Sequence, residues 1–114
     1  MSGPARDSLP PGTILDCYRV IKLIGSGGFS LIYLAEDEDT HDEVAIKEYL
    51  PKRLGKRLGL DPVSVLTPDK RASFERGRRL FYQEANILAR LHHENIVRVR
   101  NCFLANNTAY LVMD

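Results

Sequence analysis

Three glycines in the stretch GSGG, residues 25–28, separate two segments that both have the composition of β-strands. CYRVIKLI (17–24) precedes them and SLIYLAE (30–36) follows; both are rich in β-branched and aromatic residues, which favours strands. Glycine permits positive φ and close approach of the backbone to a ligand, and successive N–H groups in such a turn can bind phosphate oxygens. Ordinary hairpin turns use the same residues, so both interpretations remain open.

The segment after the glycines excludes two classes of nucleotide-binding protein. In a dinucleotide-binding fold the glycines open a helix whose N-terminus holds the pyrophosphate, whereas Ile32 and Tyr33 favour a strand here. A P-loop is excluded because no Gly-Lys-Ser/Thr follows at its spacing. An unrelated dinucleotide-binding enzyme would require a helix directly after Gly28.

The rest of the chain predicts three further strands and one long helix. The predicted bounds are 44–50 for the third strand, 73–91 for the helix, and 96–104 and 108–114 for a second hairpin. Thr67 followed by Pro68 is typical of a helix start, and HHEN (92–95) is expected to end the helix. We therefore predict an α+β fold, a five-stranded antiparallel sheet with one major helix.

The helix is predicted from the spacing of its apolar residues. Gly77 could separate a short leading turn from the main helix. The residues expected to face the core are Phe74, Phe81, Leu88 and Leu91, with Leu80, Ala85 and Ile87 widening the stripe.

Two segments outside these elements are predicted to lack regular structure. Residues 1–17 are expected to form a flexible leader, since their first part is rich in proline, glycine and serine. Residues 51–70 are predicted to be mostly loop. From Lys52 to Arg79 there are nine basic and three acidic residues, which fits either a solvated loop or a docking surface for an acidic or phosphorylated partner.

Cysteine and histidine usage gives no indication of a metal site. Cys17 and Cys102 form no metal-ligand pair, and His41, His92 and His93 have no metal-binding spacing with them. Both cysteines are expected to be reduced thiols of a cytoplasmic protein. No apolar run approaches the about 18 residues of a membrane span, and no aromatic pattern beyond that of the helix suggests nucleic-acid binding.

The strand VAIKEYL contains a lysine whose setting suggests a phosphate ligand. Alternation places Ala45 and Lys47 on one face of the strand, so a flat ring could lie on Ala45 while the amine reaches its phosphates. Glu84 lies beside the predicted core stripe of the helix, where a buried carboxylate needs a cation; Lys47 is the candidate. The alternatives are a surface lysine and an exposed glutamate paired with a neighbouring arginine.

Four segments occur in an order that resembles one family. Residues 18–114 resemble the small N-terminal lobe of a eukaryotic-like Ser/Thr protein kinase, with IKEYLP and EANILARL most similar to bacterial members. The segments that carry this resemblance are IGSGGFSLIY, VAIKEYLP, FYQEANILARLHHENIV and TAYLVMD.

The resemblance implies a role for each matching residue. Lys47 would bind the α- and β-phosphates of ATP and pair with Glu84, the two catalytic residues of this lobe. Phe29 would lie at the tip of the glycine lid, and Ser30 replaces the last glycine usual in the family. Ile24, Ile32 and Ala45 would form the adenine roof, Met113 the gatekeeper, and Asp114 the start of the hinge. The implied nucleotide-binding residues are Ile24, Gly25, Ser26, Gly27, Gly28, Phe29, Ser30, Ile32, Ala45, Lys47, Met113 and Asp114.

Phosphoryl transfer also requires residues that this sequence does not contain. HRD and DFG segments, which supply the catalytic aspartate and the Mg²⁺ ligands in kinases, are absent. We expect a kinase domain truncated at the hinge, inactive alone and able to self-associate through the surface that would face the missing lobe. The full-length protein would transfer the γ-phosphate of ATP to protein Ser or Thr; the alternative is a pseudokinase or a non-catalytic regulatory module.

Overall fold

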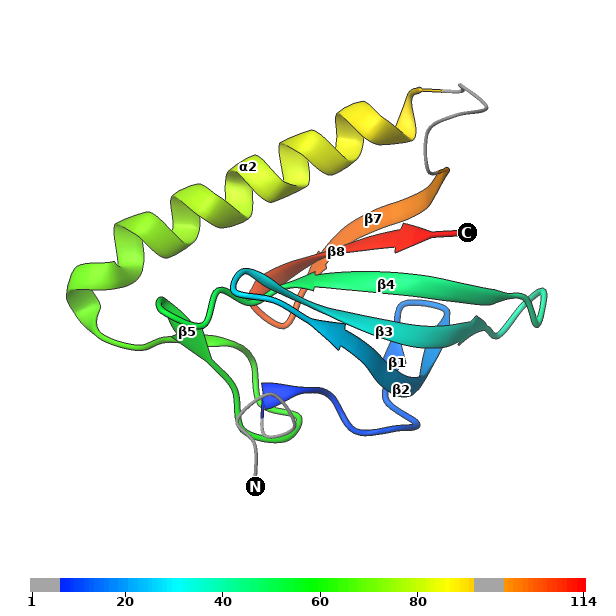
Figure 1. The fold of residues 1–114 in the computed structure, drawn as a ribbon, viewed down its shortest axis with the longest axis horizontal. Helices are drawn as coiled ribbons and strands as arrows, with labels where there is room; N and C mark the ends of the chain where they lie inside the picture. Colours follow the sequence, from blue (N-terminus) through cyan, green and yellow to red (C-terminus); the bar gives the residue numbers. More distant parts are fainter. Residues whose placement is uncertain (1–6, 92–97) are drawn as a thin grey trace.

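A computed structural model describes residues 7–91 and 98–114, which form one large sheet, a long helix and a small ribbon (Figure 1). The strands of the large sheet are β1 (Ile14–Leu15), β2 (Tyr18–Ser26), β3 (Ser30–Asp37), β4 (Glu43–Tyr49), β7 (Val99–Ala105) and β8 (Thr108–Met113). They lie in the order β1-β2-β3-β4-β8-β7, antiparallel throughout. The predicted α+β class is confirmed, but the sheet has six strands rather than five because β1 pairs with β2.

The remaining elements lie between β4 and β7. Two short strands, β5 (Gly55–Lys56) and β6 (Ser64–Val65), pair within the segment that was predicted to be mostly loop. A 3₁₀ turn, η1 (Pro68–Lys70), leads directly into helix α2 (Arg71–Ala89). Thr67 is the N-cap of η1 with Pro68 in its first turn, as predicted, although the Thr67 side chain does not cap a backbone N–H.

Helix α2 is continuous and slightly shifted from its predicted bounds. It begins at Arg71 and ends at Ala89, so Gly77 lies inside it and does not separate a leading turn. The predicted helix stop at residues 92–95 and the start of the strand predicted at 96–104 lie outside the described residues. No helix in the described part of the chain combines the length and apolar character needed to cross a membrane.

The two faces of the sheet differ, as the alternation in VAIK predicts. Val44 and Ile46 are buried on one face, while Ala45 and Lys47 are half-buried on the other. We call the face that carries Lys47 the open face. Helix α2 packs on this side, where its Phe74 and Phe81 contact Tyr49. Figure 1 shows the helix running beside β7 and β8.

Only part of the predicted core stripe of α2 is buried. Phe74 and Ala85 are buried, whereas Leu80, Ile87 and Leu91 are 53%, 60% and 44% exposed. The expectation that these three residues face the core is therefore wrong. The helix contacts the sheet through a narrower stripe than predicted. Leu80, Ile87 and Leu91 form an apolar strip that is exposed to solvent.

The N-terminal segment differs from the flexible leader predicted for residues 1–17. Leu9 and Leu15 are buried in the same core as the sheet. The backbone N–H of Leu9 donates to the Tyr33 hydroxyl at 3.1 Å, and Ile14–Leu15 form β1. Residues 7–17 therefore pack as part of the lobe.

A buried ion pair attaches residues 51–70 to the sheet. The Arg57 guanidinium donates to both carboxylate oxygens of Glu48 at 2.6 and 2.7 Å, and neither side chain is accessible to solvent. The hydroxyls of Tyr33 and Tyr110 each donate to Glu48 at 2.6 Å, while Arg57 also reaches the Asp7 carbonyl at 2.7 Å. Burial opposes the charge of Arg57, but the bonds to Glu48 outweigh it and raise the pKa of the guanidinium.

Candidate functional site

Strand register places Gly25, at the start of the glycine turn, on the same face of the sheet as Lys47. Gly25 is the cross-strand partner of Ile32, and Ile32 is the partner of Lys47. Directly opposed residues of antiparallel strands project to the same side. The row continues into β8, where Lys47 pairs with Leu111. Gly25 and Lys47 therefore lie on the same face of the sheet.

A second row on the open face is apolar. Leu34 pairs with Ala45, and Ala45 pairs with Met113 at the end of β8. Ala45 and Met113 are half-buried, as is Ile32 in the first row. Ile24 lies at a register shift between Leu23 and Gly25, is 51% exposed, and has no partner in either row.

The turn between β2 and β3 is tied to the end of β4. The N–H of Gly27 donates to the Ser30 carbonyl at 2.9 Å, closing the turn. The carbonyls of Phe29 and Gly28 accept from the N–H groups of Leu50 and Lys52, both at 3.0 Å. These bonds fix one edge of the turn, while the Phe29 side chain at its tip is 77% exposed.

The glycines of this turn are not required by the fold in this structure. Among the described glycines only Gly12 and Gly59 have positive φ, so no glycine of GSGG uses the positive φ that glycine permits. A Cβ atom added at Gly27 or Gly28 would have no neighbour within 4 Å. What the missing side chains provide is therefore free space beside the backbone, which a ligand could occupy.

Lys47 and Glu84 do not form an ion pair in the structure. Within the described residues, no hydrogen bond or salt bridge within 4.0 Å joins their side chains to each other or to another group. Lys47 is half-buried on the open face, whereas Glu84 is exposed on α2. The premise that burial forces Glu84 to find a cation does not hold here. Their pairing stays a prediction.

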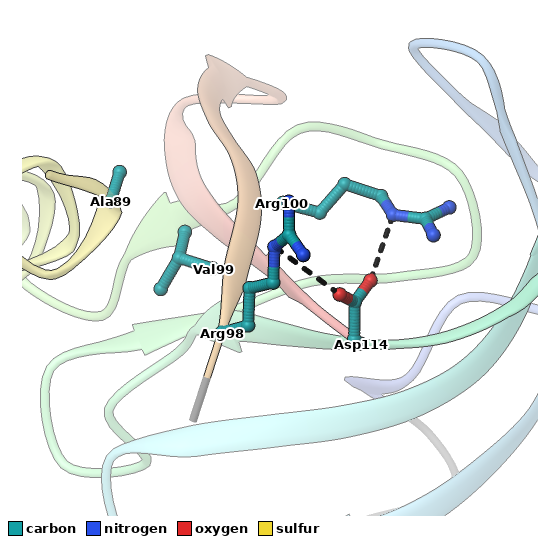
Figure 2. A pocket seen from close by; sticks show the side chains of 5 residues that line it. All are labelled: Ala89, Arg98, Val99, Arg100 and Asp114. Atoms are coloured by element: carbon teal, nitrogen blue, oxygen red, sulfur yellow. Dashed lines mark hydrogen bonds and ion pairs between the residues drawn. The ribbon is translucent and has the colours of Figure 1, made fainter. Parts of the chain in front are cut away.

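The end of β8 is held by two arginines that sequence reasoning did not identify. Figure 2 shows Arg98 and Arg100 converging on Asp114, with Nε of Arg100 at 2.9 Å from Oδ1 and Nε of Arg98 at 3.8 Å from Oδ2. They line a polar pocket of about 400 Å³ with Ala89 and Val99.

Arg100 also links this end of β8 to the turn between β3 and β4. It lies 3.3 Å from Asp37 and 3.2 Å from Asp42. The pKa of Asp37 lies below its ordinary value, first because the N–H of Asp39 donates to it and also because of Arg100. The sequence signal for this network was the pair Arg98 and Arg100, which alternate in the strand predicted at 96–104. Their three acidic partners could not be assigned from the sequence, because these residues come from other segments of the chain. The network fixes Asp114 at the edge of the open face.

The chain matches known proteins along most of its length. The model of the protein kinase domain matches residues 18–114. The serine/threonine-protein kinase ppk34 of Schizosaccharomyces pombe is 31% identical over 85% of this chain, and the CBL-interacting serine/threonine-protein kinase 12 of Arabidopsis thaliana is 32% identical over 97%. The chain spans 32% and 19% of the lengths of these two relatives.

Solved structures match the fold. A structure named PpkA-294 apo form has a TM-score of 0.89 at 33% identity, covering 95% of this chain and 38% of the other. The Mycobacterium tuberculosis PknI kinase domain has a TM-score of 0.66 at 21% identity, covering 94% and 36%. With the matched family model, the glycine turn and the lysine row, these findings show that the chain belongs to the protein kinase family, with the fold of the N-terminal lobe found in bacterial Ser/Thr kinases.

Proposed function

We propose that this chain is the ATP-binding lobe of a serine/threonine protein kinase, and that the complete protein transfers the γ-phosphate of ATP to protein Ser or Thr. The observation that carries the proposal is the row Gly25–Ile32–Lys47 on the open face. Lys47 is a half-buried cation without an anionic partner among the described residues. Its amine and the free space beside Gly27 and Gly28 suit a bound triphosphate.

In this proposal each side chain of the open face has one role. Lys47 binds the α- and β-phosphates, and the turn 25–30 lies over them. Ile32 and Ala45 provide an apolar surface for adenine together with Ile24, whose β2 segment borders the turn. Met113 lies behind the base, and the main chain at Asp114 begins the hinge that hydrogen-bonds it. Glu84 pairs with Lys47, and the ion pair directs the amine.

Magnesium would be held mainly by residues outside this chain. Mg²⁺ neutralises the phosphate charge during transfer and prefers carboxylate and phosphate oxygens. Among the described residues, the one cluster of possible ligands is Cys17, Asp37 and Asp39. It does not fit, because it includes a thiol, Asp37 already bonds Arg100, and Asp37 lies at the opposite end of β3 from the glycine turn.

A phosphoryl-transfer assay on the full-length protein tests the proposal. We expect Lys47→Met to lower transfer by about 10²–10³-fold, the usual effect of removing one charge-stabilising group. Lys52→Met is the matched control, because Lys52 is exposed and only its backbone N–H contacts the turn. Undiminished transfer by the Lys47 variant would contradict the assigned role. Binding of ATP without transfer in the wild type would favour the pseudokinase alternative.

Three further properties belong to the same proposal. The 114-residue chain alone is expected to be inactive and to bind ATP with a Kd of about 1 mM or weaker, since only half of the site is present. The exposed strip of Leu80, Ile87 and Leu91 supports self-association of the isolated chain. Two free cysteines, Cys17 and Cys102, suit a cytoplasmic protein.

A further inference from the structure

Arg100 lies at an irregularity in the ladder between β7 and β8. Val99 and Asn101 pair with consecutive residues of β8, so Arg100 is an extra residue between them, a β-bulge. Bulges re-aim the side chain of the extra residue and are common next to active sites. This bulge directs the Arg100 side chain across the end of β8, where Nε lies 2.9 Å from the Asp114 carboxylate (Figure 2).

The carboxylate of Asp114 lies on the side of the sheet away from the open face. The N–H of Asp114 donates to the Arg98 carbonyl at 3.2 Å, which extends the ladder one residue beyond β8. Because side chains alternate along a strand, Asp114 projects opposite to Met113 of the open face. Figure 2 shows Val99 pointing toward helix α2, and Asp114 on the opposite side of β7.

Arg100 joins Asp114 to a strand that lies three places away in the sheet. Its guanidinium lies 3.3 Å from Asp37, which ends β3, and 3.2 Å from Asp42, which precedes β4. Asp37 also accepts bonds from two backbone N–H groups of the turn that follows it. We call Arg100 and these three carboxylates the Arg100 network. It fixes the Asp114 side chain relative to β3 and β4, the strands that carry the glycine turn and Lys47.

A fixed side chain at Asp114 restricts the main chain of the same residue. In the proposed function this main chain hydrogen-bonds the adenine base, and such a bond weakens steeply as its angle departs from linearity. Met113 is half-buried on the open face, and Arg100 holds the next side chain on the other side through a charge-assisted bond. The peptide groups at the end of β8 are thereby held in one orientation.

We propose that Arg100 is a positioning residue for nucleotide binding. By holding the Asp114 carboxylate behind the sheet, it orients the main chain that bonds the base and so sets the affinity for ATP. Arg100 acts through Asp114 and does not touch the nucleotide. The inference rests on the proposed function, because the orientation of this main chain affects activity only if a nucleotide lies on the open face.

Steady-state kinetics of the full-length protein test this role with Arg100→Met, which keeps a long side chain but removes every ion pair of the network. We expect the KM for ATP to rise by about three- to tenfold, roughly the loss of one hydrogen bond. The kcat at saturating ATP should change little, because Lys47 and the glycine turn are intact. The inhibition constant of inorganic tripolyphosphate, which has no base, should stay unchanged. An unchanged KM, or equal weakening of ATP and tripolyphosphate, would overturn the role.

Arg19→Met is the matched control. Arg19 also joins two carboxylates of the sheet, at 2.8 Å to Glu36 and 3.3 Å to Glu38, but these partners do not belong to the Arg100 network. Arg19→Met should therefore leave the KM for ATP unchanged. If it raises the KM as much as Arg100→Met does, loss of any surface ion pair would explain the effect and the positioning role would fail.

Asp114→Asn tests whether Arg100 acts through Asp114. This change should raise the KM for ATP by a similar factor and add little when combined with Arg100→Met, because either change removes the same contact. Additive effects would overturn the inference. Arg100→Lys, which keeps a cation without the planar guanidinium, should restore part of the affinity. If Arg100→Met does not fold, Asp114→Asn and Arg100→Lys provide the same test.

The outcomes separate this inference from the proposed function. If Lys47→Met keeps full transfer and its affinity for tripolyphosphate, the proposed function fails and the inference fails with it. If Lys47→Met is inactive while Arg100→Met and Asp114→Asn match the wild type in their KM for ATP, the function stands and the positioning role fails.

Discussion

Glu48 and Arg57 form a bidentate ion pair that is completely buried between strand β4 and the segment that follows it. Glu48 is the residue after Lys47, and it projects to the opposite face of the sheet. We expect Arg57→Met to lower the free energy of unfolding by about 3–5 kcal/mol, because it leaves the Glu48 charge buried without its cation. Chemical denaturation measures the change.

An exposed arginine and a double variant are the controls for this pair. Arg98→Met removes an ion pair of 3.8 Å whose arginine is 77% exposed, so its effect should stay within about 1 kcal/mol. Glu48→Leu combined with Arg57→Met should cost less than the sum of the single changes, since no charge remains buried. Equal losses for Arg57→Met and Arg98→Met would contradict a structural role for the buried pair.

The N-terminal segment should contribute measurably to stability. Leu9 is 3% exposed, whereas Ile14 is 55% exposed. Leu9→Ala should therefore lower the free energy of unfolding by about 2–5 kcal/mol, and Ile14→Ala by no more than about 0.5 kcal/mol. Thermal or chemical unfolding of both variants measures the difference. Two small, equal effects would mean that this segment does not pack on the lobe.

Substitution of a glycine in the turn should weaken ATP binding without lowering the stability of the fold. Gly27→Ala should leave stability unchanged or raise it by about 0.4–1 kcal/mol, because the backbone and the space accept a methyl group. Its affinity for ATP should fall by about three- to tenfold, roughly the loss of one hydrogen bond. Denaturation and nucleotide titration of the full-length protein measure the two effects.

Gly55→Ala is the matched comparison for the turn. A Cβ atom at Gly55 would lie 2.9 Å from Cε1 of Phe74 and 3.3 Å from Cγ1 of Val63. This change should cost about 1–3 kcal/mol of stability through overpacking and leave ATP affinity unchanged in the folded protein. A Gly27→Ala variant that loses stability but keeps its affinity for ATP would show that this glycine serves folding and not nucleotide binding.

The pKa of His41 should lie above its ordinary value of about 6.5. Its Nδ1 lies 2.8 Å from the Glu36 carboxylate, whose hydrogen bond and charge both favour the protonated ring. Because the pKa is raised in the folded state, the stabilisation of the fold by the His41–Glu36 interaction is fully present below about pH 6.5. It is lost as the pH rises through the folded-state pKa. NMR titration of the imidazole measures it. Glu36→Gln should return the pKa toward its ordinary value, and no change in that variant would rule out this partner.

Local patterns predicted the open face, because strand alternation depends only on neighbouring residues. VAIK placed Ala45 and Lys47 on one side, and register then added Gly25 and Ile32. The order of segments along the chain also predicted the family. Strand alternation and segment order required no contact between distant residues, whereas the addition of Gly25 and Ile32 to this face rests on strand pairing in the structure.

The features that were missed depend on such contacts. Arg57 lies in a basic, glycine-punctuated segment whose composition is typical of a solvated loop, but Glu48, Tyr33 and the Asp7 carbonyl accept hydrogen bonds from its guanidinium. Leu9 is an isolated apolar residue among prolines, and its burial depends on the folded sheet. The exposure of Glu84 follows from the rotation of α2, which helical periodicity alone does not determine.

The most direct test of the account is chemical labelling of lysines by an acyl phosphate of ATP in the full-length protein. A lysine beside the bound phosphates attacks the acyl carbon, forming an amide and releasing ATP, and mass spectrometry identifies the labelled residue. The account predicts that Lys47 is labelled and that excess ATP suppresses the reaction, whereas Lys22 and Lys56 are not protected. ATP-sensitive labelling at another lysine, with Lys47 unmodified, would contradict a phosphate site on the open face.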